Sequence, residues 1–153
     1  MIIRVAFALL FSLIAGLATA SDTNLAGLKI SDAWARASIG PGLDGVAYFT
    51  LHNEDSAPVE LLAVTTPAAS EAKLHATKME DSVMKMRALK DLTVAPGETL
   101  QLAPCGSHVM LMGLAKPLEE GSSFPLTLDF GEAGTVELWV EVLSFASDGP
   151  APE

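Results

Sequence analysis

Residues 135–142 read Thr-Val-Glu-Leu-Trp-Val-Glu-Val, with an aliphatic side chain at every second position. Successive side chains of a β-strand point to opposite faces of the sheet, so this alternation predicts a strand with one face in a hydrophobic core. Val136, Leu138, Val140 and Val142 are expected on the buried face. A strand half-buried in this way needs other strands around it, and the rest of the chain supplies candidates.

Short apolar runs recur along the chain, and each is closed by Gly, Pro, Asn or Asp. Examples are residues 45–53 (GVAYFTLHN), 107–114 (SHVMLMGL) and 124–130 (FPLTLDF). No window shows a sustained helical period. Many short strands separated by turn residues predict an all-β protein, built as a Greek-key β-sandwich or barrel.

The two ends of the chain differ from this pattern. Residues 1–20 carry one charge, Arg4, before an apolar run that ends in Ala-Thr-Ala, which is typical of a cleavable signal peptide. We expect a flexible leader over 21–26, one folded domain over 27–146 and a disordered tail over 147–153. No later run reaches the roughly 18–20 apolar residues of a membrane helix, so no membrane span is expected in the mature chain.

Charge and cysteine content narrow the function further. The chain has 9 basic and 19 acidic residues, and loss of Arg4 with the signal peptide leaves 8 against 19, a net charge of −11. Such an acidic protein is not expected to bind nucleic acid or anionic lipid. Cys105 is the single cysteine, so an exported chain has no internal disulfide. The simple signal favours a periplasmic location.

The sequence contains none of the common catalytic motifs, among them G-x-S-x-G, Walker A, G-x-G-x-x-G, H-E-x-x-H and C-x-x-C. Its carboxylates fall mainly in turns and at alternate strand positions, as on a solvated face. The sequence therefore predicts a protein that is not an enzyme.

Methionine and histidine are distributed unevenly. Apart from Met1, every methionine lies within residues 79–112, and His75 and His108 bracket most of them. Strand alternation places His108, Met110 and Met112 on one face. In the same way Met84 and Met86 share a face, while Met79 is expected in the loop after residues 71–77. Methionine also fills gaps in cores, but thioethers and imidazoles without carboxylate or thiolate ligands select Cu(I).

The spacing of these residues resembles that of a known family. His75, Met86, His108 and Met110 form the pattern H-x10-M-x21-H-x-M, which is similar to the signature of the PCu(A)C periplasmic copper chaperones. Residues 32–36 (DAWAR), 47–51 (AYFTL) and 108–114 (HVMLMGL) also resemble the family's strands.

This resemblance implies a cupredoxin-like β-sandwich with His75, Met86, His108 and Met110 as Cu(I) ligands. It also implies a periplasmic metallochaperone that transfers Cu(I) by ligand exchange. The family is understood to supply the copper centres of cytochrome c oxidase, so the expected partner is a copper-accepting protein such as an oxidase subunit or a Sco-type protein. Residues 147–153 contain neither His nor Met, so we expect one copper ion, bound as Cu(I).

Three further residues are auxiliary candidates. Met84 and Met112 share faces with the assigned ligands, and Cys105 lies close to His108 in sequence. An alternative function follows from the latter spacing, because Cys105, His108 and Met110 are similar to the ligand loop of a blue-copper electron carrier. A third interpretation, an exported β-sandwich that binds a partner without metal, does not explain the His and Met pattern.

Overall fold

The computed structural model describes residues 23–25, 27–40 and 42–150, so the expected signal peptide at 1–20 lies outside the described residues. The described chain folds almost entirely as strands, with one short 3-10 turn, and none of its helices is long and apolar enough to cross a membrane. The all-β prediction is therefore confirmed. The elements are β1 (Thr23–Leu25), β2 (Leu28–Arg36), β3 (Gly45–Asn53), β4 (Val59–Leu61), β5 (Ala63–Thr65), β6 (Ala69–Glu80), β7 (Val83–Ala88), β8 (Leu92–Val94), β9 (Thr99–Gln101), β10 (Ser107–Leu114), β11 (Ser123–Asp129), η1 (Gly131–Ala133) and β12 (Thr135–Leu143).

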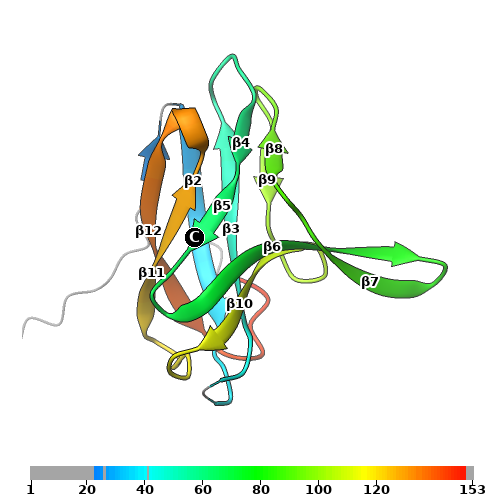
Figure 1. Ribbon diagram of the computed structural model, residues 1–153, viewed down its shortest axis with the longest axis vertical. Coiled ribbons are helices and arrows are strands. Elements are labelled where there is room, and N and C mark those ends of the chain that lie inside the picture. The colour runs from blue at the N-terminus through cyan, green and yellow to red at the C-terminus, as the bar shows by residue number, and fades with distance from the viewer. Residues whose placement is uncertain (1–22, 26, 41, 151–153) are drawn as a thin grey trace, which may run out of the picture.

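Most strands belong to one mixed sheet. Its main path runs β5-β11-β12-β2-β3-β10-β6-β7, with β1 added to β2 and β9 added to β3, while β4 and β8 form a separate pair. Only the pairing of β12 with β2 is parallel among those described. Figure 1 shows these strands wrapped into a body, from which β6 and β7 extend to one side as an arm.

The core follows the alternation read from the sequence. In β12, Leu138, Val140 and Val142 are buried, whereas Trp139 between them is 61% exposed. The corresponding inward side chains of β3 and β11 join the same cluster, which contains Phe49, Leu51, Leu126 and Leu128 among others. A single hydrophobic core therefore holds the strands together without a disulfide.

Both predicted flexible ends are more ordered than expected. Within the predicted leader, Thr23–Leu25 forms β1, because its backbone pairs with β2 and Leu25 packs against the core. The predicted disordered tail is anchored at its start, where Arg36 donates a hydrogen bond to the Ser147 carbonyl and forms an ion pair with Asp148. Polar composition alone did not reveal these partners.

The arm is a β-hairpin formed by β6 and β7, and its long strand β6 also pairs with β10. β6 pairs with β10 through residues 69–76 and with β7 through residues 75–80. Asp81 and Ser82 form the two-residue loop, with φ values of 52° and 64°, as a type I′ hairpin turn requires. This turn fixes the register of β7, which forms one edge of the sheet and has all six residues exposed.

Candidate metal centre

The pairing of β6 with β10 places two histidines side by side. His75 lies directly opposite His108 in the strand register. Their ring centroids are 5.9 Å apart and their planes are inclined by 77°. Both side chains lie on the face opposite Leu74 and Val109, which are in the core. The two imidazoles are therefore close enough to bind one ion together.

The hairpin adds a sulfur atom to this pair. Met86 on β7 lies opposite Thr77, two residue pairs further out than His75 and on the same face, and its Sδ is 3.4 Å from His75 Nδ1. Three of the four predicted ligands are thus gathered at the base of the arm. The fourth, Met110, is on the same face of β10 as His108, two residues along the strand and opposite Lys73. That separation is about 7 Å along the backbone, which a methionine side chain spans in part.

His108 has an unusual environment for a polar side chain. It is only 4% exposed, and its Nδ1 lies 3.1 Å from the Gly106 carbonyl oxygen. Because a carbonyl only accepts hydrogen bonds, Nδ1 carries the proton and Nε2 carries the free lone pair. Nε2 is buried and is the one buried side-chain nitrogen or oxygen of the described residues without a hydrogen-bond partner. Burying an acceptor without a donor destabilises the folded protein, and a ligand bound to that acceptor would offset the penalty. The free lone pair of Nε2 is therefore available for a ligand.

The Gly106 carbonyl connects the two strands of the site. Besides the His108 proton, it accepts a hydrogen bond from the Thr77 backbone N–H at 3.2 Å. The turn before β10 is thereby tied to β6 beside His75. Sequence reasoning missed Gly106, because a backbone oxygen has no signature of its own in a sequence.

His75 is held in its neutral form. Burial lowers its pKa below the usual 6.5, and the neighbouring His108 and Lys73 lower that pKa further. A neutral imidazole offers a lone pair to a metal without first losing a proton.

The auxiliary candidates lie at different distances from the histidines. Met84 is two residues beyond Met86 on the same face of β7, paired with Met79. Met112 lies opposite Glu71, which forms an ion pair with Lys73 at 2.6 Å.

Cys105 lies in none of the strands that carry the candidate histidines and methionines. It is exposed in the turn before β10 and adopts a φ of 65°. Its thiol acts electrostatically on Tyr48, whose pKa is raised mainly by burial, lowered by Arg36 and raised by Cys105. His52, the third histidine, has its Nδ1 2.8 Å from the Thr99 hydroxyl and is remote from the site in the strand register.

The gathered donors suit a soft ion. Within the described part of the chain, no three His, Cys, Asp or Glu residues come together to form a metal site. The donors that do converge are neutral imidazole nitrogens and thioether sulfur, which prefer Cu(I) to Zn²⁺ or Ca²⁺.

Comparison with known proteins places the chain in a family. Residues 28–142 match the LpqE-like family, described as putative lipoproteins. The chain belongs to the LpqE-like family. A relative, the putative lipoprotein Lxx21020 of Leifsonia xyli subsp. xyli, is 36% identical over 121 residues, which are 78% of this chain and 72% of that protein.

Solved structures relate this LpqE-like chain to PCuAC domains. The copper-bound PCuAC domain from PmoF2 superimposes with a TM-score of 0.69 at 22% identity, covering 81% of this chain and 98% of that domain. CuI-DR1885 from Deinococcus radiodurans superimposes with a TM-score of 0.54 at 30% identity, covering 82% and 83%. The resemblance to PCu(A)C proteins and the cupredoxin-like fold that it implied are therefore confirmed.

Proposed function

We propose that this protein is an exported Cu(I) chaperone that binds one ion at His75, Met86, His108 and Met110. The observation that carries the proposal is the buried Nε2 of His108, which has no partner. The His108 ring lies beside the ring of His75, which in turn contacts the Met86 sulfur. An apolar side chain of similar size would fill that position without the free-energy penalty of burying an unpaired acceptor. A polar acceptor there is therefore best explained by a bound ligand.

The chemistry of the donors and the relatives support copper as the cargo. All four ligands are uncharged, which suits a soft monovalent cation better than a hard divalent one. DR1885 from Deinococcus radiodurans, whose solved structure is 30% identical to this chain, is a Cu(I) form in that structure. Neither a hydrolytic motif nor a catalytic triad accompanies the site in the sequence, so the protein acts as a carrier and not as an enzyme.

Transfer proceeds by ligand exchange with an acceptor protein. Met86 is 52% exposed on an edge strand, so an incoming thiolate or imidazole reaches the copper from that side while His108 still holds it. The proposed acceptors are a copper-receiving subunit of cytochrome c oxidase or a Sco-type protein. An apo form of either partner should remove Cu(I) from the loaded protein.

The proposed chaperone is exported from the cytoplasm. Residues 1–20 have the pattern of a cleavable signal peptide, and both the family and the relative are described as putative lipoproteins, which are exported proteins. We place the mature protein in the periplasm.

Anaerobic titration with Cu(I) against a chromophoric chelator tests the site. We expect one tight equivalent, which is lost in His108→Ala and retained in the matched control His52→Ala, because His52 lies outside the site. X-ray absorption of the loaded protein should show both nitrogen and sulfur ligands. Tight binding that persists in His108→Ala, or that is lost in Cys105→Ser, would contradict the proposed ligand set.

A further inference from the structure

The outer half of the β6–β7 hairpin presents a second pair of sulfur atoms. Met79 and Met84 lie directly opposite each other in the register, next to the turn. They are 67% and 49% exposed. We propose that Met79 and Met84 form a second, weaker Cu(I) site at the outer end of the arm. This inference rests on the proposed function, since it extends the same cargo to another pair of ligands.

The hairpin geometry brings these two side chains together. Directly opposite residues of an antiparallel pair have Cβ atoms about 4.5–5.5 Å apart and point to the same face. Methionine has an unbranched side chain with three rotatable bonds, so both sulfurs can turn toward one ion between them. The two-residue turn at Asp81 and Ser82 holds the register that makes this pairing.

The two faces of the hairpin differ in chemistry. The contact between His75 and Met86 lies on the face of Met79 and Met84. Where β6 and β7 pair, over residues 75–80 and 83–88, Thr77 is the other polar side chain on that face and no charged side chain lies there. The nearest charges on the same face of β6 are Lys73 and Glu71, toward the body, and they form an ion pair with each other. A cation bound between Met79 and Met84 therefore has no lysine or arginine beside it on this face.

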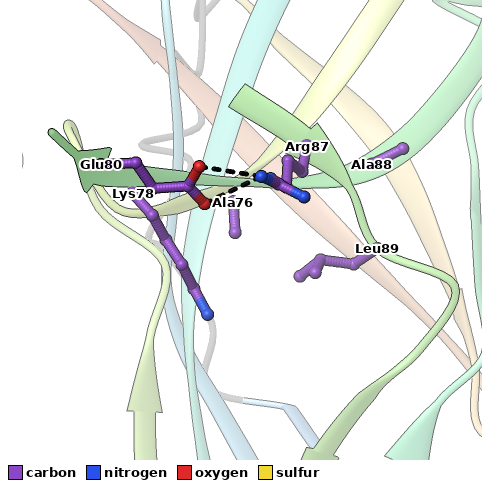
Figure 2. A pocket seen from close by; sticks show the side chains of 6 residues that line it. All are labelled: Ala76, Lys78, Glu80, Arg87, Ala88 and Leu89. Atoms are coloured by element: carbon purple, nitrogen blue, oxygen red, sulfur yellow. Dashed lines mark hydrogen bonds and ion pairs between the residues drawn. The ribbon is translucent and has the colours of Figure 1, made fainter. Parts of the chain in front are cut away.

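The charged side chains of the segment where β6 and β7 pair lie on the opposite face. Figure 2 shows the Glu80 carboxylate accepting hydrogen bonds from Arg87, at 2.8 and 2.9 Å, with Lys78 beside them. Lys85 also approaches Glu80, at 3.2 Å. These contacts confirm the alternation of faces, because residues 80, 85 and 87 are expected to share a side. Lys85 and Arg87 are therefore paired with Glu80 on the face away from the sulfur atoms.

Core packing does not account for the outer pair. A methionine that fills a gap in a core is buried, whereas Met79 and Met84 are 67% and 49% exposed. Met84 lies two residues, or about 7 Å, beyond Met86 on the same face, so the outer pair continues the row of donors that begins at His75. Since the arm projects from the body (Figure 1), a partner that docks on its end meets this pair before the inner site.

The test uses the purified protein with 13C-labelled methionine methyl groups. Under anaerobic Cu(I) titration, the first equivalent should shift the methyl signal of Met86. A second equivalent should shift those of Met79 and Met84, with an affinity on the order of 100-fold weaker, because this pair lacks imidazoles and their supporting hydrogen bonds. The double variant Met79→Leu/Met84→Leu should keep the first equivalent and lose the second. Val83→Leu, at an exposed residue on the opposite face of the same hairpin, is the control and should keep both.

The outcomes separate this inference from the proposed function. A wild-type protein that binds only one equivalent, or a double variant that still binds two, would overturn the outer site and leave the chaperone proposal intact. Shifts of Met79 and Met84 with the first equivalent would also overturn it, by making them part of the inner site. In His108→Ala, we expect the tight equivalent to disappear while the weak shifts of Met79 and Met84 remain. If the wild type binds no tight equivalent, the proposed function itself fails.

Discussion

Replacing His108 with leucine separates the metal-binding role of this residue from any structural role. His108 is 4% exposed, makes one hydrogen bond through Nδ1 to the Gly106 carbonyl, and leaves Nε2 without a partner. Leucine has a similar volume and no polar atom. We expect the metal-free His108→Leu protein to be at least as stable as the wild type, although substitutions at buried sites usually destabilise by about 0.5–3 kcal/mol.

The magnitude follows from two opposing terms. A buried acceptor without a partner costs about 1–3 kcal/mol, and leucine removes that cost. The lost hydrogen bond to Gly106 is worth about 0.5–1.5 kcal/mol. The Gly106 carbonyl keeps its bond to the Thr77 N–H, so no new unpaired group is created. The expected net change in the free energy of unfolding is a gain of about 1 kcal/mol, within a range from a loss of about 0.5 to a gain of about 2.5 kcal/mol.

Urea unfolding of the metal-free and Cu(I)-loaded proteins measures both effects. With copper at about 100 times its dissociation constant, the wild type should gain about 2.7 kcal/mol, and His108→Leu should gain nothing. His52→Leu should retain the copper-dependent gain. Leu111→Ala, at a core position with 0% exposure, should lose about 2–5 kcal/mol and calibrates the cost of a true core substitution.

Two results would refute this reasoning. A loss of more than about 2 kcal/mol in metal-free His108→Leu would mean that the imidazole is a satisfied structural group. A copper-dependent gain that survives in the variant would mean that His108 is not a ligand.

Three other predictions concern the remaining donors. Burial, His108 and Lys73 lower the pKa of His75, so as the pH falls the unfolded chain binds a proton at this residue before the folded chain does. The free energy of unfolding and the Cu(I) affinity should therefore be constant above pH 6.5 and fall as the pH drops below it. Urea unfolding and chelator competition between about pH 5 and 8 measure the two quantities. Met86→Leu should weaken Cu(I) binding at least about tenfold while changing the free energy of unfolding by less than about 0.5 kcal/mol, because the side chain is 52% exposed; a thermal or urea melt beside the titration checks both. Cys105→Ser should leave the Cu(I) affinity unchanged, and an intense visible band with Cu(II) that disappears in this variant would instead favour the electron-carrier alternative.

The alternation of apolar and polar residues was sufficient to predict much of the fold and which site residues share a face of a strand. It placed Leu138 and Val140 in the core and Trp139 outside it. It also placed His108 and Met110 on one face, because a strand has no other way to arrange residues two apart. These are local properties of a strand, so a single sequence contains them.

The missing features depend on contacts between distant segments. The apolar runs suggested that the strand containing His75 ends at residue 77, with Met79 in a loop, whereas β6 continues to Glu80 because β7 pairs with it beyond the body. Residues 78–82 are polar or charged apart from Met79, so no hydrophobic pattern marked the outer end of β6. The tautomer of His108 depends on the Gly106 carbonyl, which becomes visible only once the turn is folded.

A copper carrier must hold its ion firmly and still release it, and the candidate site divides these demands between two kinds of strand. His108 sits in an interior strand, is almost fully buried, and has its ring fixed by a hydrogen bond, so it cannot leave the ion without disturbing the sheet. Met86 sits on an edge strand that contributes no buried residue, so its sulfur can move away without disrupting the core. In the proposed carrier the weaker thioether ligand is also the accessible one, so exchange with an acceptor would begin at Met86, and the imidazoles would retain the copper until a replacement ligand has bound.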